Sequence, residues 1–160
     1  FTTTRSPAVK KKLGMNSSDP LLVWIGRVIE QKGLKYLIAA MPIVLKRFPT
    51  AKLLLIGTGT ELKKLRQQAA KLGISNTVVF YGQENNRKKL NDLLRGSDVY
   101  VMPSVWETFG IAALEAMASG LPVVLCRAAT ATEVLNDGKN VLLVDPMNPE
   151  QIARQVKKIV

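Results

Sequence analysis

The sequence has no histidine and only one cysteine, Cys126, among its 160 residues. A single cysteine excludes a disulfide within the chain and is typical of a reducing compartment. Uncharged apolar runs such as 38–45 are far shorter than the ~20 residues that a membrane-spanning helix needs. Residues 1–19 are polar and basic and contain no apolar core of a signal peptide. We therefore expect a cytoplasmic protein.

Acidic residues are also scarce, with 12 Asp and Glu against 23 Lys and Arg and a formal net charge of +11. Such a surface can bind nucleic acids or anionic lipid head groups, so a basic module that binds anions or nucleic acid is one alternative. Aromatic residues, on which bases could stack, make up only 6% of the chain. We expect no nucleic-acid partner, and most lysines are interpreted as a solvated face.

Short apolar runs alternate with segments that have helical spacing. The runs lie at 21–25, 52–56, 77–80, 98–102, 121–125 and 141–144. Near-continuous hydrophobic strands between helices indicate a parallel sheet covered on both faces. The sequence therefore predicts an α/β fold, a Rossmann-like three-layer α/β/α domain with about six parallel strands, over residues 20–160. Residues 1–19 are interpreted as a basic linker or arm.

The segment 103–122 carries the most specific pattern in the chain. It places Glu107 after an expected strand and Glu115 inside the helix that follows, with Gly110 in the turn between them. Unpaired N–H groups and the helix dipole favour a phosphate at such a helix start. Two carboxylates around a phosphate site suit a ligand with hydroxyls at both ends, and a nucleotide sugar is a ligand of this kind.

This segment resembles the E-x7-E element of the group 1 retaining glycosyltransferases, which have the GT-B fold and include glycogen and sucrose-phosphate synthases. Further elements of that family are similar and follow in the family order: Gly26-Arg27 with Lys32-Gly33, Gly57-Thr-Gly59, Tyr81-Gly82, Glu133 to Gly138, and Leu142 to Pro146. The resemblance covers roughly residues 20–160 and implies one half of a GT-B enzyme, the half that binds the nucleotide-sugar donor.

The resemblance also implies roles for four charged side chains. Arg27 and Lys32 would hold the diphosphate and neutralise the charge that grows on it as it leaves. Glu107 would contact hydroxyls of the donor sugar. Glu115 would accept hydrogen bonds from the ribose, because a carboxylate offers two acceptor oxygens to a vicinal diol.

Other positions would complete the donor site. Gly26 follows the first strand, and Phe109, Gly110 and Ile111 would act mainly through backbone N–H groups. The base would be selected near Tyr81-Gly82-Gln83, where Tyr81 either stacks on the base or is buried in its strand. The donor could be a UDP-, GDP- or ADP-sugar. We expect no metal and no cofactor besides this substrate.

Some positions depart from the family pattern. Ala129-Thr130 stands where a Gly-Gly pair is usual, and Asn140-Val141 where Thr-Gly is usual, so the preference for base or sugar stays open. The family residue that assists at the reacting carbon from the opposite domain is missing too. We therefore expect a chain that binds nucleotide but transfers little sugar without the N-terminal acceptor domain, its expected partner.

Two further expectations follow from the family. A nucleotide-sugar epimerase shares the two-domain fold and is an alternative enzyme class. Many group 1 transferases act on lipid-linked acceptors, so peripheral contact with the anionic inner face of a membrane is a further partner to consider.

Overall fold

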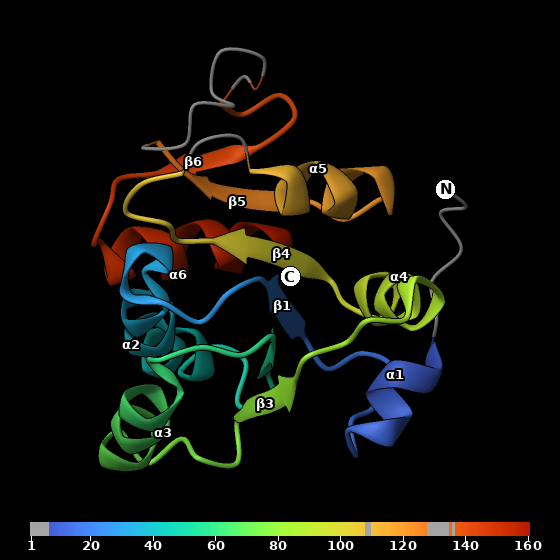
Figure 1. Ribbon diagram of the computed structural model, residues 1–160, viewed down its shortest axis with the longest axis horizontal. Helices are drawn as coiled ribbons and strands as arrows, with labels where there is room; N and C mark the ends of the chain where they lie inside the picture. The colour runs from blue at the N-terminus through green and yellow to red at the C-terminus, as the bar shows by residue number, and fades with distance from the viewer. Residues whose placement is uncertain (1–6, 108–109, 128–134, 136) are drawn as a thin grey trace.

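The computed structural model describes residues 7–107, 110–127, 135 and 137–160. Within them, six parallel strands form one sheet in the order β3-β2-β1-β4-β5-β6 (Figure 1). The strands are β1 Leu21–Ile25, β2 Lys52–Ile56, β3 Val78–Gly82, β4 Val99–Met102, β5 Val123–Cys126 and β6 Leu142–Val144. The predicted α/β fold with six parallel strands is confirmed.

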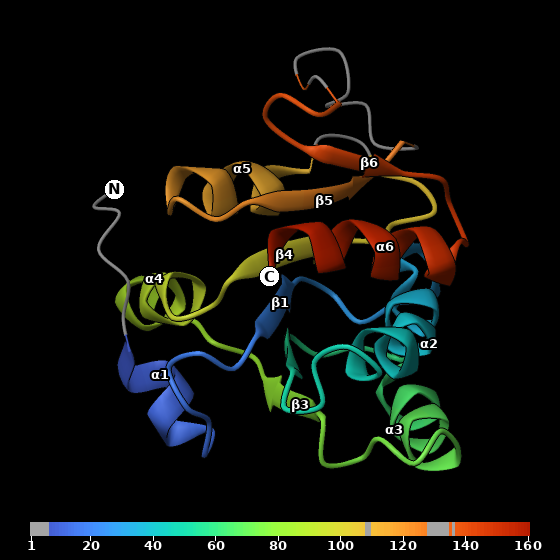
Figure 2. The same ribbon diagram turned by 180° about the vertical axis from the view of Figure 1, so that it is seen from behind.

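Helices cover both faces of this sheet. They are α1 Pro7–Lys12, η1 Glu30–Lys32, α2 Leu34–Leu45, α3 Leu62–Lys71, α4 Arg87–Arg95, α5 Ile111–Ala118 and α6 Pro149–Ile159. One core cluster joins the sheet to α2, α3 and α6, and the other joins it to α1, α4 and α5. Figures 1 and 2 show α2 and α3 on one side and α1 and α4 on the other. No described helix is long and apolar enough to cross a bilayer.

Strand β1 shows why each strand is a continuous apolar run in the sequence. Leu22 and Trp24 belong to one core cluster, whereas Leu21 and Val23 belong to the other. Because successive side chains of a strand point to opposite faces, a strand covered on both faces needs an apolar residue at every position.

The strand order reverses between β1 and β4. From β1 the chain first builds outward through β2 and β3, and then continues on the other side with β4, β5 and β6. In open parallel sheets the loops at the carboxyl ends diverge at such a reversal and leave a crevice. The loops after β1 and β4 therefore define where a ligand can enter.

Residues 7–19 pack against the domain. Val9 in α1 and Met15 after it are buried in the second core cluster. The Nζ of Lys10 lies 2.8 Å from Asp98 Oδ2, with side-chain exposures of 8% and 14%. The same Asp98 oxygen accepts the N–H of Leu21 at 2.7 Å. The boundary between arm and domain at residue 19 stays a prediction, although α1 contributes to the core.

We expect Lys10→Met to lower the free energy of unfolding by about 2–4 kcal/mol, because a mostly buried carboxylate would lose its cation. Urea unfolding of the whole chain measures this loss. The matched control is Lys11→Met on the same helix, where the exposed lysine should change stability by no more than about 0.5 kcal/mol. Equal effects of the two variants would contradict the role of the buried pair.

Candidate functional site

Two hollows meet at the carboxyl ends of the central strands. The first, of about 230 Å³, is lined among others by Gly26, Arg27, Lys32, Glu107, Gly110 and Ile111. The second, of about 460 Å³, is lined among others by Gly57, Thr58, Gln83, Glu84 and Asn85. Both include Ile25, Gly26 and Arg27. A crevice therefore crosses the ends of β4, β1, β2 and β3, with Arg27 at its middle.

Backbone hydrogen bonds hold the loops after β1, β2 and β3 together. The N–H of Gly26 donates to Ile56 O at 3.0 Å, and that of Gly57 donates to Gly82 O at 2.7 Å. Gly57 has a φ of 141°, and a Cβ placed on it would lie 1.8 Å from the carbonyl oxygen of Gly26. Only glycine allows this approach, so the glycine after β2 shapes the floor of the second hollow.

A second close approach joins the loop after β1 to the loop after β4. Gly33 has a φ of 65°, and a Cβ there would lie 2.1 Å from the carbonyl oxygen of Pro103. The N–H of Val105 donates to Gln31 O at 2.9 Å across the same contact. Lys32, between Gln31 and Gly33, is thereby held against the loop that carries Glu107.

Lys32 and Glu107 form an ion pair. The Lys32 Nζ lies 2.5 Å from Glu107 Oε2, and the side chains are 18% and 13% exposed. Ser104 Oγ lies 3.5 Å from the same carboxylate oxygen. The sequence predicted both residues for the site but assigned them to different parts of the ligand. The structure brings them into direct contact.

Tyr100 of β4 lies beneath the crevice and was missed by the sequence reasoning. Its side chain is fully buried, and its hydroxyl donates to the carbonyl of Ile25 at 3.4 Å. Burial raises the pKa of Tyr100, and the charges of Glu107 and Glu115 raise it further. The phenol is therefore neutral at physiological pH. A hydroxyl within an otherwise apolar strand was the available signal.

The start of α5 supplies backbone donors to the first hollow. Gly110 occupies the N-cap position with a φ of 63°, and no side chain among the described residues caps this end. Ile111 at the first helical position is 64% exposed. Uncapped N–H groups at a helix start favour an anion. The expected phosphate position therefore lies beside Arg27, which is exposed in the same hollow.

Three predicted site residues are not among the described residues that line the two hollows. Glu115 is half-buried in α5, and its charge acts on Tyr100. Tyr81 lines a separate groove between α1 and α4, of about 220 Å³, and its hydroxyl donates to Glu84 at 3.3 Å. Burial raises the pKa of Tyr81. Phe109 lies outside the described residues. A contact of Tyr81 with the base stays a prediction.

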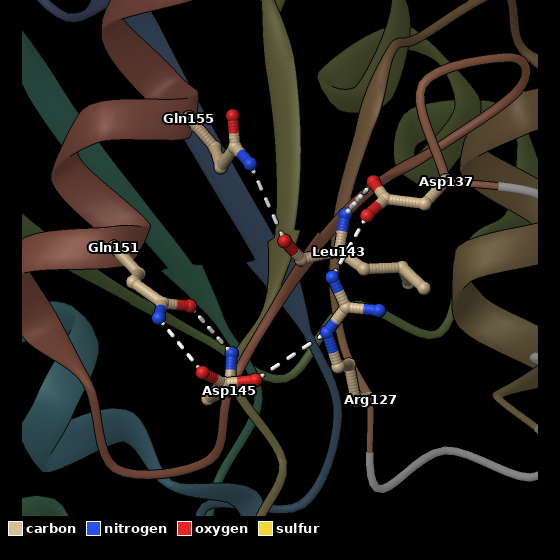
Figure 3. Close-up of polar contacts among 6 residues, drawn as sticks. All are labelled: Arg127, Asp137, Leu143, Asp145, Gln151 and Gln155. Carbon is tan, nitrogen blue, oxygen red and sulfur yellow. Dashed lines mark hydrogen bonds and ion pairs between the residues drawn. The ribbon is translucent and has the colours of Figure 1, made fainter.

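Polar contacts fix β6 beside the end of β5 (Figure 3). Arg127 lies 2.8 Å from Asp137 through Nη2 and 3.3 Å from Asp145 through Nε. Asp137 also accepts the N–H of Leu143 at 2.9 Å, and Gln151 of α6 exchanges two hydrogen bonds with Asp145. The Leu143 N–H and, secondarily, Arg127 hold the pKa of Asp137 below its usual range.

The departures from the family pattern at Ala129-Thr130 lie outside the described residues.

Asp137→Asn should weaken the acid dependence of stability. A lowered pKa in the folded state adds stability above the unfolded value of about 3.9, and this contribution disappears as the pH falls through the folded pKa. Because the ion pair is partly exposed, we expect a loss of at most about 1 kcal/mol at neutral pH. Urea unfolding from neutral to acidic pH checks this; a difference that persists undiminished in acid would contradict it. Glu150→Gln on exposed α6 is the control.

Gly33→Ala should destabilise the fold more than Gly73→Ala. Both glycines have left-handed backbone, with φ of 65° and 70°, but a Cβ on Gly73 meets nothing within 4 Å. The shared conformational cost is about 1–2 kcal/mol. The contact with Pro103 should add about 1–3 kcal/mol for Gly33 alone. Thermal or urea unfolding of both variants measures the difference. Equal losses of unfolding free energy would show that the Pro103 backbone can move away without cost.

Comparison with known proteins agrees with this architecture. The family described as "Glycosyl transferases group 1" matches residues 6–160. The chain therefore belongs to the group 1 glycosyltransferases. It is 39% identical over 150 residues to the uncharacterized glycosyltransferase MJ1607 of Methanocaldococcus jannaschii, covering 94% of this chain and 38% of that protein. The chain spans less than half the length of the first curated relatives.

Two solved structures illustrate the shared fold. The C-terminal domain of the group 1 protein LpcC from Francisella tularensis superposes with a TM-score of 0.84 at 26% identity, covering 98% of this chain and 84% of that domain. Alr3699/HepE from Anabaena, solved in complex with UDP-glucose, gives the same TM-score and identity and covers 98% of this chain and 44% of that protein. The domain is the C-terminal half of a GT-B fold.

Proposed function

We propose that this domain binds the nucleotide-sugar donor of a retaining glycosyltransferase. The observation that carries the proposal is the convergence at one crevice of Arg27, Lys32, Glu107 and the uncapped start of α5. This combination offers cations and backbone N–H groups to phosphates and a carboxylate to hydroxyls. HepE, a relative in fold at 26% identity, has been solved with UDP-glucose, which supports the same ligand class here.

Each part of such a donor has a proposed place along the crevice. The diphosphate would lie where the two hollows meet, against Arg27 and the first turn of α5. The sugar would extend toward Glu107 in the first hollow. The nucleoside would occupy the second hollow, where Gln83 and Asn85 offer polar groups to a base. Glu115 is assigned to the ribose on the family resemblance, and the base is left open among uracil, guanine and adenine.

The role of the cations follows from the chemistry of transfer. When the bond between the anomeric carbon and the diphosphate breaks, the electron pair leaves with the diphosphate, and its negative charge grows. Arg27 supplies a planar fork for phosphate oxygens and Lys32 a compact charge. Charges held in place before the reaction stabilise the leaving group without reorganisation.

Transfer itself is proposed for a larger enzyme. The chain covers 38% of the MJ1607 protein and 44% of HepE, so we assign acceptor binding to another part of a longer protein. The donor-binding half alone should bind nucleotide and transfer little or no sugar. Contact of the basic surface with an anionic membrane remains part of this proposal for the whole enzyme.

Arg27→Ala should weaken binding of a nucleoside diphosphate by about 1.5–3 kcal/mol, a tenfold to hundredfold loss, because a charge-assisted contact is removed. Calorimetry with UDP, GDP and ADP identifies the nucleotide and measures the loss. The bare nucleoside should be much less affected, since it has no phosphate for Arg27 to hold.

Arg154→Ala is the matched control, because Arg154 is an exposed arginine on α6. It should leave nucleotide affinity unchanged while removing the same charge. If Arg27→Ala weakened nucleoside and diphosphate equally, or weakened neither, the diphosphate assignment would fail. Binding of RNA in competition with the nucleotide would instead favour a basic nucleic-acid module.

A further inference from the structure

The ion pair between Lys32 and Glu107 joins two residues that a bound donor would need separately. The pair is nearly buried, with side-chain exposures of 18% and 13%. The two loops that carry it are fixed to one another, since Val105 N–H donates to Gln31 O at 2.9 Å and the Gln31 side chain donates to Trp106 O at 3.2 Å. The charges are therefore already neutralised by each other before any ligand arrives.

We propose that Glu107 determines specificity by competing for Lys32: it lowers the affinity for a sugar-free nucleoside diphosphate and spares that for the nucleotide sugar. This inference rests on the proposed function, because it assumes that the donor occupies this crevice. It goes further by assigning to Glu107 a second effect, which is the withdrawal of a cation from the phosphate site.

The cost of moving Lys32 depends on what replaces it at Glu107. A carboxylate that is 13% exposed is poorly hydrated, so exchanging its contact with the Lys32 ammonium for nothing of opposite charge is unfavourable. A sugar-free diphosphate brings no group to this carboxylate and adds like charge nearby. Its gain from Lys32 is therefore offset by the broken ion pair.

A nucleotide sugar changes this balance. Its hydroxyls donate hydrogen bonds, and a carboxylate has acceptor capacity for several of them. The hydroxyls can then satisfy Glu107 while Lys32 turns to the diphosphate. The same two residues would retain the donor and release the nucleoside diphosphate once the sugar has left.

Glu107→Gln provides the main test, with UDP and UDP-glucose as probes in calorimetry of the whole chain. The amide keeps the shape of the side chain and removes the charge that holds Lys32. We expect UDP to bind roughly three- to tenfold more tightly, which is the difference between a charged and a neutral hydrogen-bond acceptor for Lys32. UDP-glucose should bind no more tightly than before, because the contact with the sugar is weakened. Glu150→Gln, an exposed change of the same charge, should alter neither.

A Lys32→Gln background separates competition from simple repulsion. If Glu107 acts by holding Lys32, Glu107→Gln should give no gain in UDP affinity once Lys32 is absent. A gain that persists there would show repulsion between carboxylate and phosphate and would overturn the proposal. Unchanged or weaker UDP binding by Glu107→Gln alone would overturn it as well.

Lys32→Gln also tests the idea should Glu107→Gln fail to fold. It should weaken UDP binding less than Arg27→Ala does, because the phosphate contact of Lys32 replaces an existing ion pair and that of exposed Arg27 does not. An equal or larger loss would contradict the competition. If the unaltered chain bound none of UDP, GDP, ADP or their glucose conjugates, the proposed function itself would fail, which is a distinguishable result.

Discussion

The close approach of backbone segments at the strand ends is the constraint on which the site depends. The loop after β2 touches the loop after β1 where Gly57 meets the Gly26 carbonyl, and the start of α2 touches the loop after β4 where Gly33 meets the Pro103 carbonyl. Side chains at these two glycines would push the loops apart. The shape of the crevice therefore depends on the lack of a side chain at these two glycines. The close approach of the loops also fixes where the charged residues between the glycines lie.

The sheet could be predicted from sequence because each strand is buried on both faces. β1 and β2 begin and end where their apolar runs do. β5 starts at Val123, two residues after the start of its run, because Leu121-Pro122 leads into the strand. Four predicted site residues from two separate motifs, Gly26, Arg27, Lys32 and Glu107, all line the first hollow, and their roles toward a ligand stay predictions. The family resemblance assigns each of these residues a role toward the ligand. It does not indicate which of them contact one another.

What the sequence could not predict were contacts between distant segments and the direction of side chains. Lys32 and Glu107 are 75 positions apart, and only the folded loops bring them together. Tyr81 follows Phe80, which packs in one core cluster, so the alternation of a strand turns Tyr81 to the opposite face with α1 and α4. The interpretation of residues 1–19 missed the burial of Val9 and Met15 because one short helix carries too few positions to show a period.

The attachment of α1 means that the segment which folds is longer than the segment which carries the recognition motifs. The first motif of the crevice begins after β1, yet Asp98, at the amino end of β4, shares its carboxylate between the start of β1 and Lys10 of α1. A boundary drawn where the motifs begin would remove the lysine that pairs with this carboxylate. Domains recombined between related enzymes would therefore keep this ion pair only when the joint lies upstream of α1.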